Sequence, residues 1–278
     1  MPLELAQARL AVPLLEKYFF SRSDAVAVGE AGRTPQPASA TLRAVLSTHV
    51  AGSLAPPAVV RPQAKNSLAG AWSGHFRVGS YCLNAESKVR WLCLDFDAGS
   101  SHANALADPT GTALAAHGAF SARGVPAYLE RSGGGHGWHL WVFFRELLPA
   151  AKARRLAFHL APKDALLADG DIADPESGRG IEIFPKQDRI TKGGFGNLVW
   201  LPWWCDAAPG GNVFMRVSPG TGALQPWFPE SFDTLEEGQL DATLAALDAE
   251  AAARAPVVAP GDPTIDVGAF EFPPDEVS

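Results

Sequence analysis

An apolar run from Trp91 to Asp97, with the sequence WLCLDFD, ends in two carboxylates separated by one residue. Side chains alternate between the two faces of a β-strand, so Asp95 and Asp97 are expected on one face, with Leu94 and Phe96 on the other. Two adjacent carboxylates repel each other unless a cation lies between them, and hard divalent metals select this arrangement. The pair alone leaves two interpretations open: a metal site, or a strand end with two solvated aspartates.

Length and composition limit the domain organisation. The chain has 278 residues and is 47% hydrophobic, which suffices for one large domain or two closely packed subdomains. We expect residues 1–250 to form this folded part. Residues 255–278 are rich in Pro, Ala and Asp, lack periodicity and are predicted to be disordered.

The sequence also limits the compartment and the partners. No apolar run approaches the roughly 18 residues of a membrane span and no signal segment begins the chain, so a cytoplasmic protein without a membrane partner is predicted. The three cysteines are far apart and form no CxxC pair, so neither a zinc ribbon nor a disulfide framework is expected. The formal net charge of -7 argues against a protein that coats nucleic acid, but not against an enzyme with one local basic groove.

The pattern of residues 72–204 predicts an α+β domain with a mixed or antiparallel sheet, because strand-like and helix-like segments are interleaved. A strand over 74–83, a polar turn over 84–88 and a strand over 89–97 predict a β-hairpin. A helix over 111–123, closed by Gly124, is the expected crossover of a βαβ unit that spans 89–131. Further expected elements are a strand over 139–144, a helix over 150–167 and strands over 181–184 and 198–204.

A second polar segment lies at 129–144. Glycines at positions 133, 134, 135 and 137 would let a phosphate approach the backbone N–H groups closely. His139 is expected to project from one face of the following strand together with Trp141 and Phe143. A flexible loop beside a core histidine is the simpler interpretation. Among functional roles, a hydrogen bond from His139 to a phosphate or hydroxyl is favoured over a metal-ligand role.

A third polar segment begins at Glu182. Ile181 and Ile183 are expected to face the core, which places Glu182 on the opposite face of its strand. A third carboxylate beside two aspartates would give an oxygen-rich site of the kind that holds Mg²⁺ or Mn²⁺. Three cations follow at intervals of three residues and suit phosphate oxygens, namely Lys186, Arg189 and Lys192.

These segments, with the sequences DFD, ERSGGGHGWHLWVFF and EIFPKQDRITKGGFGNLVWLP, resemble the archaeo-eukaryotic primase superfamily. The resemblance is closest to the primase-polymerase domains of TOTE conflict systems and their CRISPR-associated relatives, and it covers roughly residues 14–247. It implies an N-terminal α/β part packed on an RRM-like part, with the active site in the cleft between them. It also implies a nucleotidyltransferase that makes or extends primers, encoded by a bacterium, phage or plasmid.

The resemblance implies roles for individual residues. Asp95, Asp97 and Glu182 match catalytic metal ligands for two Mg²⁺ or Mn²⁺ ions about 3.5–4 Å apart, and His139 matches the histidine that contacts the incoming nucleotide. The expected nucleotide-binding residues are Arg131, Ser132, Gly137, His139, Lys186, Gln187, Arg189 and Lys192. Two positions depart from the family pattern. Gly137 stands where many relatives have a serine, and glutamate replaces the commoner aspartate at position 182, which leaves Asp188 as a rival third carboxylate.

The resemblance also implies that the substrates are a single-stranded DNA template with its primer and dNTPs or NTPs. The sequence shows no helicase domain, so any unwinding partner, a helicase or a single-strand-binding protein, is expected to be a separate chain. Two other functions stay open. A nucleotide-sugar glycosyltransferase would explain Asp95 and Asp97 but not Glu182 with the basic cluster, and a non-catalytic single-strand-binding module could share the fold. The tryptophans at positions 138, 141, 203 and 204 are expected to lie mostly in the core, although one could stack on a template base.

Overall fold

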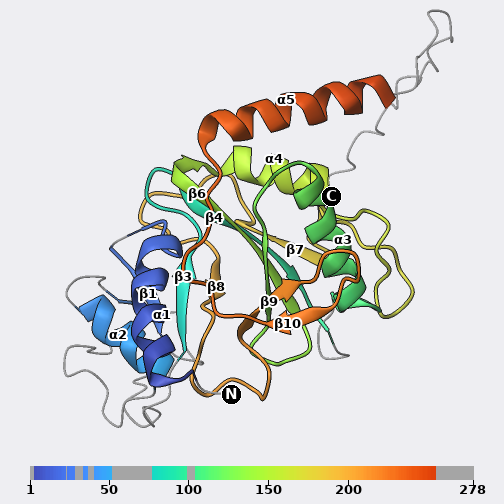
Figure 1. Ribbon diagram of the computed structural model, residues 1–278. Helices are drawn as coiled ribbons and strands as arrows, with labels where there is room; N and C mark the ends of the chain where they lie inside the picture. The colour runs from blue at the N-terminus through green and yellow to red at the C-terminus, as the bar shows by residue number, and fades with distance from the viewer. Residues whose placement is uncertain are drawn as a thin grey trace, which may run out of the picture.

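Two antiparallel sheets form the framework of the computed structural model, which describes residues 3–22, 24–28, 34–36, 41–51, 77–98 and 104–254 (Figure 1). The larger sheet has the strand order β10 (Leu224–Pro226), β9 (Val213–Val217), β5 (Tyr128–Arg131), β6 (Trp138–Pro149), β4 (Lys88–Phe96) and β7 (Ile181–Phe184). The smaller sheet has the order β2 (Thr34–Gln36), β1 (Val26–Val28), β3 (Val78–Tyr81) and β8 (Leu198–Trp200). The α+β class with antiparallel sheets is therefore confirmed.

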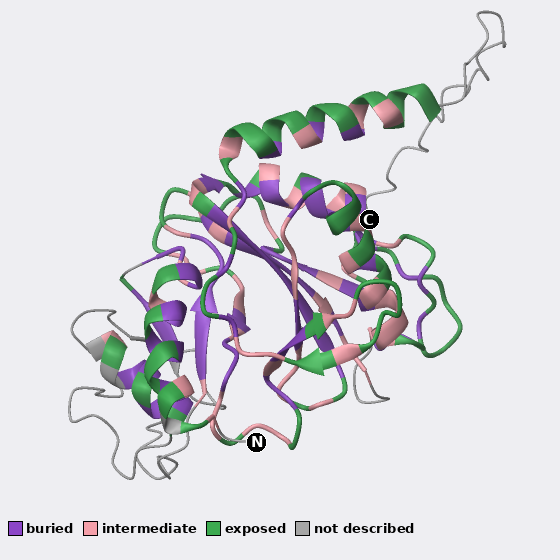
Figure 2. Cartoon of the chain, viewed as in Figure 1, coloured by how far each residue is buried: buried purple, intermediate pink, exposed green. Residues whose placement is uncertain are grey.

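The two faces of the larger sheet are covered by different parts of the chain. Helices α3 (Pro109–Ala122) and α4 (Ala150–Leu160) pack on one face, where the indole of Trp138 donates a hydrogen bond to Thr110 Oγ1 of α3. The other face carries Trp91, Trp141 and Phe143, which contact Phe19 at the end of α1 (Leu5–Tyr18). Because both faces are covered, most residues of the strands β4 and β6 are buried, as the purple ribbons of Figure 2 show.

The remaining helices lie at the edges of this framework. α2 (Thr41–Ala51) packs against α1, and α5 (Glu237–Arg254) lies over α4 (Figure 1). α5 buries the leucine stripe Leu240, Leu244 and Leu247, and its outer face is exposed (Figure 2). The predicted domain boundary at residue 250 falls within α5. The predicted disordered tail, 255–278, lies outside the described residues.

The predicted hairpin of residues 74–97 is wrong. A turn does form, since the Asn84 side chain accepts hydrogen bonds from the backbone N–H groups of Glu86 and Lys88. The strands on either side of it, however, join different sheets: β3 pairs with β1 and β8, whereas β4 pairs with β6 and β7. A turn of this length does not fix strand pairing, and an apolar strand such as β4 gains more by lying at the centre of the larger sheet.

The predicted βαβ unit is present in a modified form. β4 and β5 both pair antiparallel with β6, so they run parallel to each other with β6 inserted between them. α3 makes the crossover and ends before Gly124, which has a φ of +67°. Two predicted elements are shorter than expected: α4 ends at Leu160 and β8 ends at Trp200.

None of the helices in the described part of the chain is both long enough and apolar enough to span a membrane.

Candidate active site

Four ionisable side chains form one row across the larger sheet. The strand register pairs Glu130 of β5 with His139 of β6, His139 with Asp95 of β4, and Asp95 with Glu182 of β7. Residues directly opposite each other in an antiparallel sheet project from the same face. Asp97 lies two residues beyond Asp95 and therefore extends the row on this face, just past the end of β4.

Three members of this group could hold a metal ion. Carboxylate oxygens of Asp95, Asp97 and Glu182 all lie within 4.8 Å of one another, and each of the three residues is partly exposed. The sequence prediction that these carboxylates converge is therefore met by the geometry. An all-oxygen donor set with access to solvent fits Mg²⁺ or Mn²⁺, both of which prefer carboxylates and water as ligands.

Glu182, and not Asp188, completes this cluster. Glu182 Oε1 accepts hydrogen bonds from Lys186 Nζ at 2.6 Å and from Asn104 Nδ2 at 3.3 Å. Asp188 instead pairs with Arg154, with 2.8 Å between the carboxylate Oδ1 and the guanidinium Nε. The rival third carboxylate is thus bound to a cation on α4.

A cavity of about 670 Å³ lies over the carboxylates, between the two sheets. Its lining from the larger sheet and the adjoining loops includes Asp95, Asp97, Asn104, His139, Glu182 and the segment 132–137 apart from Gly135. The opposite wall comes from the smaller sheet, where Arg77 precedes β3 and Trp200 ends β8. The Arg77 guanidinium lies 5.3 Å from the centre of the Trp200 ring and 4.9 Å from that of Trp204. The cavity has the size typical of small-molecule sites.

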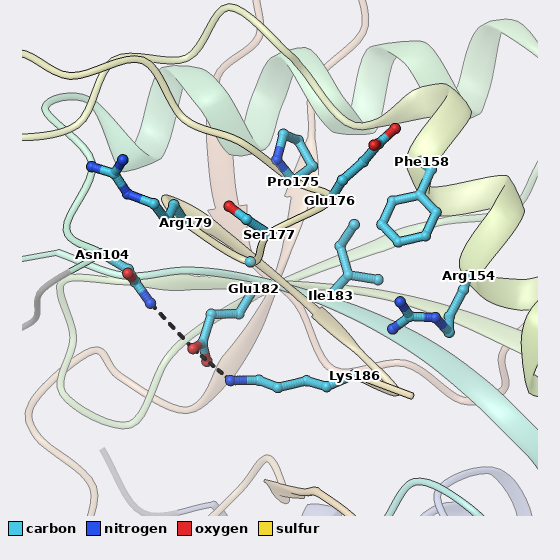
Figure 3. A pocket seen from close by; sticks show the side chains of 11 residues that line it. Asn104, Arg154, Phe158, Pro175, Glu176, Ser177, Arg179, Glu182, Ile183 and Lys186 are labelled. Atoms are coloured by element: carbon cyan, nitrogen blue, oxygen red, sulfur yellow. Dashed lines mark hydrogen bonds and ion pairs between the residues drawn. The ribbon is translucent and has the colours of Figure 1, made fainter. Parts of the chain in front are cut away.

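A smaller pocket of about 190 Å³ adjoins the carboxylates on the side of Glu182 (Figure 3). Glu182 and Asn104 line both spaces, so the two are neighbours. Lys186, Arg154 and Arg179 bring three cations to its lining, against the carboxylates of Glu176 and Glu182. Arg154 projects from α4 toward this pocket in Figure 3 and also donates a hydrogen bond to the backbone oxygen of Pro185 at 2.7 Å.

His139 is buried at the edge of the larger cavity. Its Nδ1 lies 3.0 Å from Glu130 Oε2, and its Nε2 lies 3.6 Å from Asp95 Oδ1. Burial by itself lowers the pKa of the imidazole, but the two flanking carboxylates, Glu130 and Asp95, outweigh this effect and raise the pKa of His139 to about 10. The two carboxylates thus favour the protonated form of the His139 ring beside the carboxylate cluster.

The glycine-rich loop between β5 and β6 forms part of the cavity lining. A Cβ atom at Gly137 would lie 2.9 Å from the carbonyl oxygen of Phe96 and 3.0 Å from Ser132 Oγ. Gly137 is therefore required by a close backbone approach, and the Ser132 hydroxyl already lies beside the position that a side chain at residue 137 would take. A Cβ atom at Gly133 would likewise lie only 2.5 Å from a terminal nitrogen of Arg77, so this guanidinium lies against the loop.

The predicted nucleotide-binding residues separate into two groups. Ser132, Gly137 and His139 line the larger cavity and Lys186 lines the smaller one. The other four residues line neither: Arg131 stacks on Trp138, Gln187 is half-buried, and Arg189 and Lys192 are exposed.

Several lining residues and one buried partner of His139 were not predicted from the sequence. Arg77, Trp200 and Asn104 line the larger cavity, Arg154 lines the smaller one, and Glu130 Oε2 lies 3.0 Å from His139 Nδ1. The alternation of β5 and β6 carried a signal for Glu130, because a charged residue in an apolar strand requires a partner. No local pattern indicated the other four. Of the four tryptophans expected in the core, those at 138, 141 and 203 are buried and Trp204 is half-buried.

Comparisons with known proteins identify the family. A search of curated protein sequences found no match. Among solved structures, the chain is similar to the archaeo-eukaryotic primase domain of the cyanophage S-2L primase-polymerase, with 14% sequence identity over 68% of this chain and 94% of the other. The TM-score of that match is 0.26, which is below the level that indicates a shared fold. A sequence model of one family, however, matches residues 44–217, well over half of the chain. The chain therefore belongs to the archaeo-eukaryotic primase domain family of the TOTE conflict systems.

Proposed function

We propose that this chain is a primase-polymerase that joins nucleotides on a single-stranded DNA template by divalent-metal-dependent nucleotidyl transfer. The observation that carries the proposal is the convergence of Asp95, Asp97 and Glu182 beside a cavity of about 670 Å³. Membership of the primase domain family supports a nucleotidyltransferase of the primase type. A glycosyltransferase would use the Asp95–Asp97 pair, but it would not account for the family membership.

Asp95, Asp97 and Glu182 are the residues that would hold the metal ions, in a two-metal arrangement of Mg²⁺ or Mn²⁺. Ions bound there would activate the primer 3′-hydroxyl and offset negative charge on the reacting phosphates. The carboxylates fit this role because they are partly exposed and close enough to share ions. Lys186 Nζ, 2.6 Å from Glu182, is placed to contact a phosphate oxygen near the same ions.

The remaining lining residues bind and orient the nucleotide. His139 Nε2, on the side of the ring facing Asp95, donates a hydrogen bond to a phosphate oxygen, and the glycine loop lets the phosphates approach the backbone. Trp200, on the opposite wall, offers an aromatic face for a nucleobase. Arg131, Gln187, Arg189 and Lys192 lie outside the cavity lining, and the exposed cations Arg189 and Lys192 suit the phosphates of the template or primer strand.

Incorporation of labelled nucleotides on a primed single-stranded template, with Mg²⁺ or Mn²⁺, tests the proposal. The wild-type protein should extend the primer, and Asp95→Asn/Asp97→Asn should lose extension while it keeps its affinity for DNA. An unprimed template with dNTPs or NTPs then separates de novo priming from extension. Absence of extension by the wild type with either metal, or equal extension by the variant, would contradict the proposal. DNA binding without any incorporation would identify a non-catalytic single-strand-binding module.

A further inference from the structure

Glu130 is a fully buried carboxylate beside the site, and the proposed chemistry assigns it no role. Its Oε2 accepts hydrogen bonds from His139 Nδ1 at 3.0 Å and from Trp141 Nε1 at 2.7 Å, and its Oε1 accepts one from Asn212 Nδ2 at 2.7 Å. Burying an isolated carboxylate is costly, and three donors offset that cost only in part. An apolar residue would serve the core at least as well, so the presence of Glu130 calls for a reason other than packing.

Asn212 fixes the Glu130 carboxylate in place. Asn212 is buried and has a φ of +60°, a conformation that asparagine adopts more readily than most residues. Its Oδ1 accepts a hydrogen bond from the backbone N–H of Trp204 at 2.7 Å, which determines which way the side-chain amide faces. Its own backbone N–H donates to the carbonyl of Arg131 at 2.7 Å, and its carbonyl accepts from the N–H of Trp203 at 2.9 Å. The donor that Asn212 offers to Glu130 therefore has one orientation.

The fixed carboxylate determines how His139 can lie. A carboxylate accepts but does not donate, so Nδ1 must be the protonated nitrogen on this side of the ring. With Nδ1 held by Glu130, Nε2 is directed to Asp95, at 3.6 Å, and to the cavity. A rotated imidazole would lose the bond to Glu130 and would turn a C–H edge toward the cavity.

We propose that Glu130 is a positioning residue that holds the His139 ring so that Nε2 faces the nucleotide phosphates. The inference depends on the proposed function only for its kinetic consequence, because the orientation of His139 is measurable without any substrate. Comparable partners that orient a metal-binding histidine contribute about 10- to 100-fold to affinity or activity. We therefore expect Glu130→Ala to lower kcat/KM for nucleotide incorporation by about 10- to 100-fold.

The hydrogen-bond pattern provides a rescue variant that keeps a hydrogen-bond acceptor for His139 while it moves the negative charge from residue 130 to residue 212. In Glu130→Gln, the new amide NH₂ must face a hydrogen-bond donor on either side: His139 and Trp141 at the Oε2 position, or the Asn212 NH₂ at the Oε1 position. Asn212 cannot turn its side-chain amide to relieve this conflict, because its Oδ1 accepts a hydrogen bond from the backbone N–H of Trp204. Glu130→Gln/Asn212→Asp removes this conflict. The carbonyl of the new glutamine accepts from His139 and Trp141, while the new aspartate accepts from the glutamine NH₂ and from Trp204. The double variant keeps His139 in place with a neutral acceptor.

The orientation is tested by NMR of protein labelled with ¹⁵N-histidine, with the His139 signal identified by its loss in His139→Gln. The wild type should show a His139 Nδ1–H proton that exchanges slowly with water, because the bond to Glu130 is buried. The signal of this slowly exchanging proton should be absent in Glu130→Ala, and it should return in Glu130→Gln/Asn212→Asp. Trp141→Phe is the matched control, since it removes another donor to the same Glu130 oxygen but leaves the bond to His139. Loss of the signal in Trp141→Phe, or its retention in Glu130→Ala, would overturn the proposal.

The kinetic arm uses a double-mutant cycle. If Glu130 acts through His139, then Glu130→Ala/His139→Ala should be no slower than His139→Ala alone, whereas independent effects would multiply. The rescue variant should recover most of the wild-type kcat/KM. Multiplying effects, or a rescue variant that regains the N–H proton but not the activity, would overturn a positioning role. If the wild type incorporates no nucleotide at all, the proposed function fails, and the NMR result still decides whether Glu130 orients His139.

Discussion

Asp95 and Glu182 face each other across neighbouring antiparallel strands, and together with Asp97 they bring three carboxylates within 4.8 Å. Like charges directly opposite each other destabilise a sheet. Lys186 offsets part of the repulsion through its contact of 2.6 Å with Glu182. A divalent cation bound at this point would remove the rest, so metal binding and stability should be linked.

This linkage predicts different behaviour for Glu182 and Asp188. Saturating Mg²⁺ or Mn²⁺ should raise the melting temperature of the wild type, with about 2.7 kcal/mol of stabilisation at 100 times the Kd. Glu182→Gln should lose most of this shift. Asp188→Asn is the matched control and should retain it, because Asp188 pairs with Arg154 and not with the cluster. Thermal unfolding with metal and with a chelator measures the shift, and equal shifts in the two variants would exclude Glu182 as the third ligand.

Gly137 is predicted to be required for stability. A Cβ atom at this position would lie 2.9 Å from the backbone oxygen of Phe96, which cannot move without distorting β4. Gly137→Ala should therefore cost about 1–3 kcal/mol in the free energy of unfolding, and Gly137→Ser should cost no less. The control is Gly134→Ala, because no heavy atom lies within 4 Å of the added Cβ at that position. Urea unfolding that shows the same small effect for both alanine variants would contradict the close approach.

The basic residues after Glu182 should contribute unequally. Lys186 contacts Glu182 beside the cavity. Lys186→Ala should therefore raise the KM for the nucleotide about tenfold, because loss of one hydrogen bond to a charged phosphate costs about 1.5 kcal/mol. Lys192 is exposed and outside both pockets, so Lys192→Ala should leave that KM almost unchanged. Its expected effect is a lower affinity for single-stranded DNA with a weaker salt dependence. Steady-state incorporation and DNA titrations at several salt concentrations distinguish the two, and a large KM effect of Lys192→Ala would place it at the triphosphate.

The carboxylate cluster was predictable from the sequence because strand alternation is a local property. Once the Trp91–Asp97 and Ile181–Phe184 segments are recognised as strands, the apolar residues fix which face Asp95 and Glu182 occupy. The pairing of β4 with β7 then brings those two faces together. The face that His139 occupies was predictable for the same reason, since His139 lies on one face of β6 together with Trp141 and Phe143.

The opposite wall of the cavity was not predictable in this way. Arg77 and Trp200 belong to the smaller sheet, and their distance from Asp95 depends on how the two sheets pack. The mistaken hairpin has the same origin, because pairing of β3 with β8, more than 100 residues away in sequence, is decided by tertiary contacts and not by the turn at Asn84. The basic pocket likewise requires α4 to carry Arg154 over β7.

The ion pair between Arg22 and Asp24 predicts a specific pH dependence of stability. The two residues form two bonds of 2.7 Å, and the Arg22 side chain is only 6% exposed. The hydrogen bond from Arg22 lowers the pKa of Asp24 below its ordinary value of 3.8, against the opposing effect of burial. A lowered folded-state pKa means that the stabilisation is present above pH 3.8 and is lost as the pH falls through the folded-state value.

Asp24→Asn should therefore be less stable than the wild type near neutral pH, and the difference should disappear in acid. Because the Asp24 side chain is 63% exposed and screened by solvent, the expected difference is below about 1 kcal/mol. Asp171→Asn serves as the control, because Asp171 and its partner Arg179 are both exposed. Loss of this ion pair should change the free energy of unfolding very little at any pH. Chemical unfolding at a series of pH values measures both variants. A difference between Asp24→Asn and the wild type that grows as the pH falls would show that the pair does not stabilise the fold through the ionised carboxylate.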